Sequence, residues 1–360
     1  MCPWFDSWRH HKKSLLNGRD FFVLIPIFPI TKNPPSLIQL SERISFSSLE
    51  SYLVSQGWST KAEHISKIAI AGEGNMNVVL RITTNQRSFI LKQSRPYVQK
   101  YQDIPAPLER ILVEKKFYET IAENKSLQPH FPKIIGYDTA AYILMMEDLG
   151  DCDDMGFLYA KKGIDDTHLK KLTSILKNIH ATAPPLDFPE NSEMRKLNHQ
   201  HIFVLPFLES NGFSLDAIQP GLQTLSAPYR RDEELKAVVL EIGERYLSKG
   251  TTLLHGDYYP GSWMTNTRNL YVIDPEFSFI GFAAFDIGVM VAHCILATNQ
   301  EAYLEKIVQF YGGDVSKELI RKTAGIEIMR RIIGLAQLPL IRTLGEKKEL
   351  LRLAKKMMLS

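Results

Sequence analysis

The sequence lacks the features that identify several common classes of protein. Its three cysteines, Cys2, Cys152 and Cys294, are scattered without a C-x-x-C spacing, so neither a disulfide scaffold nor a structural zinc site is indicated. No hydrophobic run approaches the roughly 18 residues of a membrane span, and a net charge of +3 is too small to indicate nucleic-acid binding. The pattern GxxxxGK[ST] does not occur, which argues against a P-loop protein. The scattered cysteines fit a reducing compartment, and we expect a cytoplasmic protein without membrane or nucleic-acid partners.

The remaining composition is that of an ordinary globular protein. With 360 residues, of which 44% are hydrophobic and 23% charged, the chain is long enough for two domains and a large core. Residues 1–39 begin like a signal peptide, with a basic and aromatic start before an apolar stretch. Pro26 and Pro29 interrupt that stretch and no small-x-small site follows it. We therefore expect a poorly ordered extension, or a start codon assigned too far upstream, rather than a cleaved signal.

The most informative segment holds three acidic residues at turns and strand ends. Asp257 closes the motif HGD at residues 255–257, where glycine allows the backbone to turn sharply around one carboxylate. A β-forming run at residues 270–273 leads directly into Asp274-Pro275-Glu276. Such a set suits phosphoryl transfer, because one carboxylate can accept the proton of an attacking hydroxyl while others hold Mg²⁺ against phosphates. Any one of these acids alone could be a plain loop residue, but a β run that feeds Asp-Pro-Glu has no evident structural use.

The N-terminal half of the chain is rich in β-forming runs. We predict strands near residues 65–70, 78–82 and 88–93, and a strand pair over residues 133–146. The turn between the first two contains four residues that we assign to nucleotide binding: Gly72, Gly74, Asn75 and Asn77. Backbone N–H groups of such a turn can bind phosphates, although most glycine-bearing turns are plain hairpins. Lys92 ends an apolar strand, where a rigid backbone can aim its cation at phosphates.

The rest of the chain is mostly helical in pattern. We predict helices over residues 47–55, with Ser47-Ser48 as its cap, and over 107–123, 166–182 and 233–249. Residues 183–226 contain five prolines and read as an irregular connection.

Four segments resemble the aminoglycoside phosphotransferase/choline kinase superfamily, and within it the 5-methylthioribose kinases most closely. They are GEGNMNVVLRI from residue 72, FILKQSRPYV from residue 89, the HGD segment that ends in Gly261-Ser262, and VIDPEFSFIGFAAFDIG from residue 272. The resemblance covers roughly residues 40–345. It implies an α+β, protein-kinase-like fold, with an antiparallel β N-lobe over residues 40–148 and a mainly helical C-lobe over 149–360.

The resemblance also implies roles for particular residues. Lys92 is expected to pair with an acid on the next helix, and the match of LERILVE favours Glu114 over Glu109. Glu147 and Leu149 fall at the hinge that meets adenine, and Asp286 is expected to bond the backbone of the catalytic loop. The expected site is completed by Asp257 as the catalytic and acceptor-binding acid, Asp274 and Glu276 as Mg²⁺ ligands, and Arg330 and Arg331 as contacts to a sugar.

These assignments predict an ATP- and Mg²⁺-dependent kinase for a hydroxyl of a small molecule, with 5-methylthioribose as the leading acceptor and homodimer formation left open. Three departures from the family concern the acceptor: residues 101–105 lack the Trp of its substrate loop, and Tyr259 and Pro260 stand where His and Thr are usual. A relative that acts on another sugar, an amino alcohol or an aminoglycoside is one alternative. A nucleotide-binding pseudokinase is another.

Overall fold

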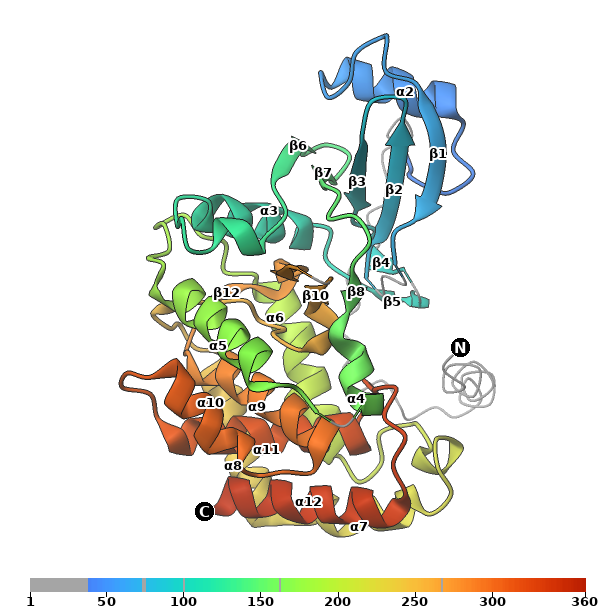
Figure 1. Cartoon of the computed structure of the whole chain (residues 1–360). Coiled ribbons are helices and arrows are strands. Elements are labelled where there is room, and N and C mark those ends of the chain that lie inside the picture. Colours follow the sequence, from blue (N-terminus) through green and yellow to red (C-terminus); the bar gives the residue numbers. More distant parts are fainter. Residues whose placement is uncertain (1–37, 73–75, 100, 162, 267) are drawn as a thin grey trace.

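A computed structural model describes residues 38–360 of the chain, except residues 73–75, 100, 162 and 267. It consists of a small lobe built on an antiparallel sheet and a larger, mainly helical lobe (Figure 1). The predicted fold class is therefore confirmed. Gly74 and Asn75 of the predicted nucleotide turn, and nearly all of the predicted extension, lie outside the described residues.

The sheet of the small lobe has five strands in the order β1-β2-β3-β7-β6, and neighbouring strands are antiparallel. Their bounds are β1 Ile65–Ile70, β2 Val78–Thr84, β3 Ser88–Gln93, β6 Ile134–Asp138 and β7 Ile143–Glu147. Alternating apolar residues of β2 and β3 pack against helix α2 (Phe46–Ser55) in a small core of their own. The predicted cap of this helix is wrong: Ser45 is the cap, and its hydroxyl accepts from the Ser48 N–H at 3.2 Å.

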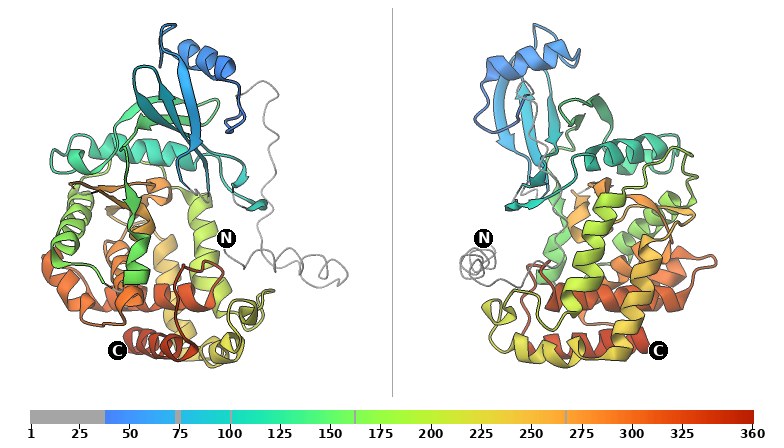
Figure 2. Two further views of the ribbon diagram at one scale, coloured as in Figure 1. Left: turned by 45° about the vertical axis from the view of Figure 1, so that its right-hand side comes forward. Right: turned by 180° about the vertical axis from the view of Figure 1, so that it is seen from behind.

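Helix α3 (Arg110–Ile121) lies between the two lobes in all three views (Figures 1 and 2). It follows a short hairpin of β4 (Tyr97–Val98) and β5 (Tyr101–Pro105). Its apolar residues, such as Phe117 and Ile121, belong to the hydrophobic core of the large lobe and not to that of the sheet. The helix is therefore packed firmly on the large lobe, while its first turns reach the base of the small one.

The large lobe consists of helices around a two-stranded and a three-stranded sheet. Its helices are α4 Leu158–Lys161, α5 Asp166–Ala181, α6 Ser192–His199, α7 Leu222–Arg230, α8 Glu233–Leu247, α9 Ala284–Thr298, α10 Tyr303–Tyr311, α11 Lys317–Ile333 and α12 Leu344–Leu359. Residues 183–226 are less irregular than predicted, because the prolines gather in the connections and leave room for α6, a π-helical turn (Gln200–Val204) and the start of α7. Across the described ranges, no helix has the length and apolar character of a membrane span.

The two small sheets of the large lobe carry the acidic segment. Strand β9 (Thr252–Leu254) pairs with β12 (Phe279–Gly281), and β10 (Trp263–Thr265) pairs with β11 (Leu270–Val272) and with β8 (Asp153–Asp154). Behind them runs α9, in which every residue from Ala284 to Ala297 is buried. This frame fixes the loop after β9 and the loop after β11 beside one another, so the HGD motif and the Asp-x-Glu pair lie at one end of the lobe.

Candidate active site

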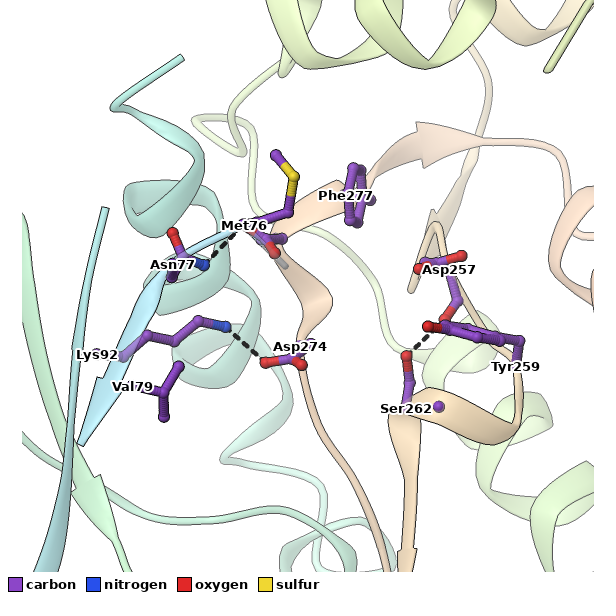
Figure 3. A pocket seen from close by; sticks show the side chains of 11 residues that line it. Met76, Asn77, Val79, Lys92, Asp257, Tyr259, Ser262, Asp274 and Phe277 are labelled. Atoms are coloured by element: carbon purple, nitrogen blue, oxygen red, sulfur yellow. Dashed lines mark hydrogen bonds and ion pairs between the residues drawn. The ribbon is translucent and has the colours of Figure 1, made fainter. Parts of the chain in front are cut away.

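A cavity of about 450 Å³, counting its open mouth, lies where the two lobes meet. The residues that line it come from both lobes: Met76, Asn77, Val79, Lys92, Asp257, Tyr259, Gly261, Ser262, Asp274, Glu276 and Phe277. In Figure 3, Lys92 points from the sheet toward Asp274, and Asp257 lies across the cavity from both. The fold thus brings the predicted lysine and the predicted acids, which are remote in sequence, around one space.

Lys92 is held in the cavity by two carboxylates. Its position on β3 is set by pairing with Val79 of β2 and Leu144 of β7, and its side chain is only 3% exposed. Nζ lies 2.7 Å from Oε2 of Glu114 and 2.6 Å from Oδ1 of Asp274. Burial lowers the pKa of Lys92, but the nearby carboxylates, Asp274 first, raise it by more, so the lysine is a stable cation. The partner on α3 is Glu114, as expected.

The two acids of the Asp-x-Glu pair differ in their surroundings. The Asp274 side chain is 46% exposed, and its backbone is left-handed at φ 62°, which turns the chain into the short helix Pro275–Phe277. Glu276 is buried instead. Its Oε2 accepts from Nδ2 of Asn77 at 2.9 Å and lies 3.2 Å from Nε of Arg110.

These two acids fit a Mg²⁺ site of the kind that bound phosphates complete. Oδ2 of Asp274 and Oε1 of Glu276 accept no hydrogen bond from any residue that the structure describes. No group of three or more His, Cys, Asp or Glu side chains suited to a metal occurs among the same residues. Mg²⁺ commonly takes one or two protein carboxylates and fills its other positions with water and phosphate oxygens, so the two carboxylates that line this cavity would be sufficient if phosphates bound there.

The loop that carries Asp257 is fixed from below by Asp286. The carboxylate of Asp286, at the start of α9, accepts from the backbone N–H of His255 at 2.7 Å and of Gly256 at 3.0 Å, which confirms the contact expected from the resemblance. Gly256 has φ 86°, and a Cβ there would come within 2.2 Å of the Phe277 carbonyl oxygen. The sharp turn therefore requires glycine.

The two predicted arginines point inward and not to solvent. The side chains of Arg330 and Arg331, near the end of α11, are 12% and 7% exposed. Arg331 Nη2 lies 3.8 Å from Oδ1 of Asp257, and its guanidinium covers the Tyr259 ring at 5.1 Å. The arginine pair thus lies beside Asp257.

A carboxylate that the sequence analysis missed holds both arginines. Glu327 receives Nη1 of Arg330 at 3.1 Å on one oxygen and Nε of Arg331 at 2.6 Å on the other. Burial would raise the pKa of Glu327, but Arg330 and Arg331 lower it by more, so it is ionised. The signal was present in the sequence, since the spacing E-x-x-R-R places a glutamate one helical turn before both arginines.

Behind Glu327 lies a buried chain of hydrogen bonds. His293 Nε2 is 3.1 Å from Oε1 of Glu327, and its Nδ1 is 2.5 Å from the hydroxyl of Tyr159. Burial lowers the pKa of His293 to about 4, so the ring is neutral at physiological pH. Since a carboxylate can only accept, Nε2 carries the proton and Tyr159 donates to Nδ1. This chain fixes the rotamer of Glu327 and through it the arginine pair.

Of the remaining predicted nucleotide residues that the structure describes, Asn77 belongs to the cavity lining and Gly72 does not. Gly72 has φ 157° and open space beside its Cα, and Asn77 directs its side chain to Glu276, Arg110 and Ser94. Glu147 ends β7 and Leu149 lies two residues beyond; neither belongs to the described lining.

The pKa of Asp257 predicts how activity depends on pH. Burial raises this pKa to about 6, opposed by the positive charges of Arg331 and Arg330 and aided by Glu327 and Glu276. An acid that accepts or orients a proton must be ionised, so kcat/KM is expected to fall as the pH is lowered through about 6. Arg331→Gln removes an opposing cation and should move this midpoint to higher pH. Initial rates at subsaturating acceptor report it; a flat profile, or a midpoint that Arg331→Gln leaves in place, would contradict the assignment.

Most of the chain matches the model of a known protein family. The model of a family described as "Phosphotransferase enzyme family" matches residues 67–324. This span contains Lys92, the HGD motif and the Asp-x-Glu pair, and it ends shortly before Arg330.

Several curated relatives of the chain are methylthioribose kinases. The chain is 29% identical over 238 residues to the methylthioribose kinase of Exiguobacterium sibiricum, which covers 63% of the chain and 60% of the relative. It is 27% identical over 339 residues to that of Geobacillus sp. (strain WCH70), which covers 78% and 81%. The first three such alignments span 55%, 60% and 62% of the relatives' own length.

Among solved structures, the chain is similar to choline kinase LicA from Streptococcus pneumoniae. The TM-score is 0.51 at 16% sequence identity, over 87% of this chain and 98% of the other. At this identity the likeness concerns the fold, in which a sheet-bearing lobe sits on a helical one.

Proposed function

Because the chain belongs to the phosphotransferase enzyme family, we propose that it is a kinase that transfers the γ-phosphoryl group of ATP to a hydroxyl of a small polar acceptor, with Mg²⁺ as cofactor. One observation supports this more than any other: Lys92, paired with Glu114 and Asp274, faces the same cavity as Asp257. A pseudokinase that only binds nucleotide would not need both the lysine with its paired carboxylates and Asp257.

Each of these residues has a role that follows from its position around the cavity. Lys92 would neutralise the phosphates from the sheet side, and Asp274 and Glu276 would hold Mg²⁺, which reduces the negative charge that repels an incoming hydroxyl. Asp257, across the cavity, orients that hydroxyl and accepts its proton as the O–P bond forms and the bond to the leaving ADP oxygen breaks. Because phosphoryl transfer needs little covalent help from the protein, catalysis consists mainly of positioning and electrostatic stabilisation.

The charges beside Asp257 favour a neutral acceptor. Glu327 balances one of the two arginines, and ionised Asp257 balances the other. The charged groups around Asp257 therefore leave no surplus of negative charge, which a polycationic aminoglycoside would need. Arginine forks donate well to sugar oxygens and to the phosphate being formed. We propose a ribose-like acceptor, with 5-methylthioribose as the first compound to test.

The test is a transfer assay with ATP, Mg²⁺ and three acceptors: 5-methylthioribose, choline and kanamycin. We expect phosphorylation of the sugar. Arg330→Ala and Arg331→Ala should each lower kcat/KM for the acceptor by about 10-fold or more, as expected for a lost charge-assisted hydrogen bond, with little effect on the KM for ATP.

Arg352→Ala is a matched control, because Arg352 is exposed on α12 and pairs only locally with Glu349. It should leave both parameters unchanged. Phosphorylation of kanamycin but of no sugar, or full activity in the Arg330→Ala/Arg331→Ala double variant, would refute the acceptor class.

A further inference from the structure

Helix α3 carries two buried charged residues, one turn apart. One interacts with Asp274 through Lys92, and the other interacts with Glu276. Arg110 and Glu114 are both 0% exposed. Glu114 acts through Lys92, which reaches Asp274. Arg110 reaches Glu276 directly, with its Nε 3.2 Å from Oε2. Of these contacts, the pairing of Glu114 with Lys92 was expected from the family resemblance, and the contact of Arg110 with Glu276 was not.

Every nitrogen of the Arg110 guanidinium has an acceptor. Nε donates to Oδ1 of Asn77 at 2.9 Å, Nη2 donates to the Met76 carbonyl at 2.7 Å, and Nη1 donates to the carbonyls of Arg95 and Pro107 at 2.9 and 2.5 Å. A planar fork with several donors is needed for this arrangement, so a lysine could not reproduce it. The side chain thereby joins α3, the segment after β3 and the last two residues of the predicted phosphate turn.

Arg110, Asn77 and Glu276 form a closed triangle. Because Oδ1 of Asn77 accepts from Arg110, its Nδ2 is left to donate to Oε2 of Glu276 at 2.9 Å. One oxygen of the buried Glu276 carboxylate is thus held by the Asn77 amide N–H and by the charge of the Arg110 guanidinium beside it. The other oxygen accepts nothing from the described residues, and Glu276 lines the cavity.

We propose that Arg110 is a positioning residue that orients Oε1 of Glu276 toward Mg²⁺ and ties the metal site to Met76 and Asn77. This rests on the proposed function, because it supposes a nucleotide-bound Mg²⁺ at Asp274 and Glu276. Arg110 acts through Glu276, because its own side chain does not belong to the cavity lining. Groups behind a metal ligand typically change metal affinity or activity by about 10- to 100-fold when they are removed.

The test measures the gain in ADP affinity that Mg²⁺ gives, by titration of the whole protein with ADP in Mg²⁺ and in EDTA. The ratio of the ADP affinity in Mg²⁺ to the ADP affinity in EDTA should fall about 10-fold or more in Arg110→Met and by a smaller factor in Arg110→Lys. The ADP affinity in EDTA should stay near that of the wild type. Arg342→Met is the matched control. Arg342 is also buried and donates to backbone carbonyls, those of Leu296 and Ala297, but it lies away from the cavity lining. It should leave the ratio unchanged even if it lowers the Tm.

Arg110→Lys keeps the experiment decisive if Arg110→Met does not fold. Combined with Glu276→Gln, Arg110→Lys should lower the ratio no further than Glu276→Gln does alone, because both changes act on one carboxylate. An unchanged ratio in Arg110→Lys, or additive losses in the double variant, would overturn the proposal. A wild-type protein whose ADP affinity does not respond to Mg²⁺ would instead refute the proposed function, and this inference with it.

Discussion

Asp257→Ala is expected to lower kcat by more than about 100-fold, the effect of removing a general base or an orienting acid, while ADP affinity stays nearly unchanged. Asp257 lies across the cavity from Lys92 and Asp274 (Figure 3), so its loss should not disturb the residues expected to meet the phosphates. Single-turnover rates and ADP titration measure the two effects separately.

Asp257→Asn distinguishes loss of the charge from loss of the side chain. It keeps the shape and leaves an oxygen near Arg331, so the acceptor should still bind while turnover is lost. Near-normal turnover in either variant would show that another group accepts the proton.

Asp274→Asn is expected to have the second large effect, because it removes an anionic oxygen ligand from Mg²⁺ and weakens the pairing with Lys92. The Mg²⁺ concentration for half-maximal rate should rise by about 10-fold or more. It should also rise for Glu276→Gln, because Asn77 and Arg110 would hold the amide oxygen and leave toward the metal an NH2 group that cannot bind Mg²⁺. The measurement is initial rate against free Mg²⁺ at saturating ATP.

Asp187→Asn serves as the control, because this carboxylate is exposed and pairs with Lys116 on the surface. It should show the metal dependence of the wild type. If Asp274→Asn and Glu276→Gln also show wild-type dependence, the Asp-x-Glu pair does not bind the metal.

Much of the small lobe could be predicted because its signals are local. The β-forming run predicted the bounds of β3 correctly, and Lys92 was recognisable as a cation at the end of an apolar strand. The choice of Glu114 over Glu109 needed the family resemblance, since both acids lie on the same predicted helix. The structure agrees, with Glu114 buried against Lys92.

Arg110 and Glu327 could not be assigned from the sequence, because their roles depend on what packs against them. Arg110 looks like any arginine on an amphipathic helix until the loop after β11 places Glu276 beside it. Glu327 has the spacing of an ordinary helical ion pair, which is usually a surface feature of small effect. Only the burial of α11 against α9 turns it into the carboxylate that holds both arginines.

The contacts that close the cavity also have a consequence for how the chain reaches its fold. Lys92 and Asp274 are 182 residues apart, and Asn77 and Glu276 are 199 apart. Bringing such distant segments together loses conformational entropy before the contact contributes any favourable free energy. Long-range pairs therefore tend to form late in folding. The sheet with α2 and the helical lobe each have a core that can form first. A chain emerging from the ribosome can therefore complete its sheet, with Lys92 in place, well before the segment that supplies Asp274 has been made.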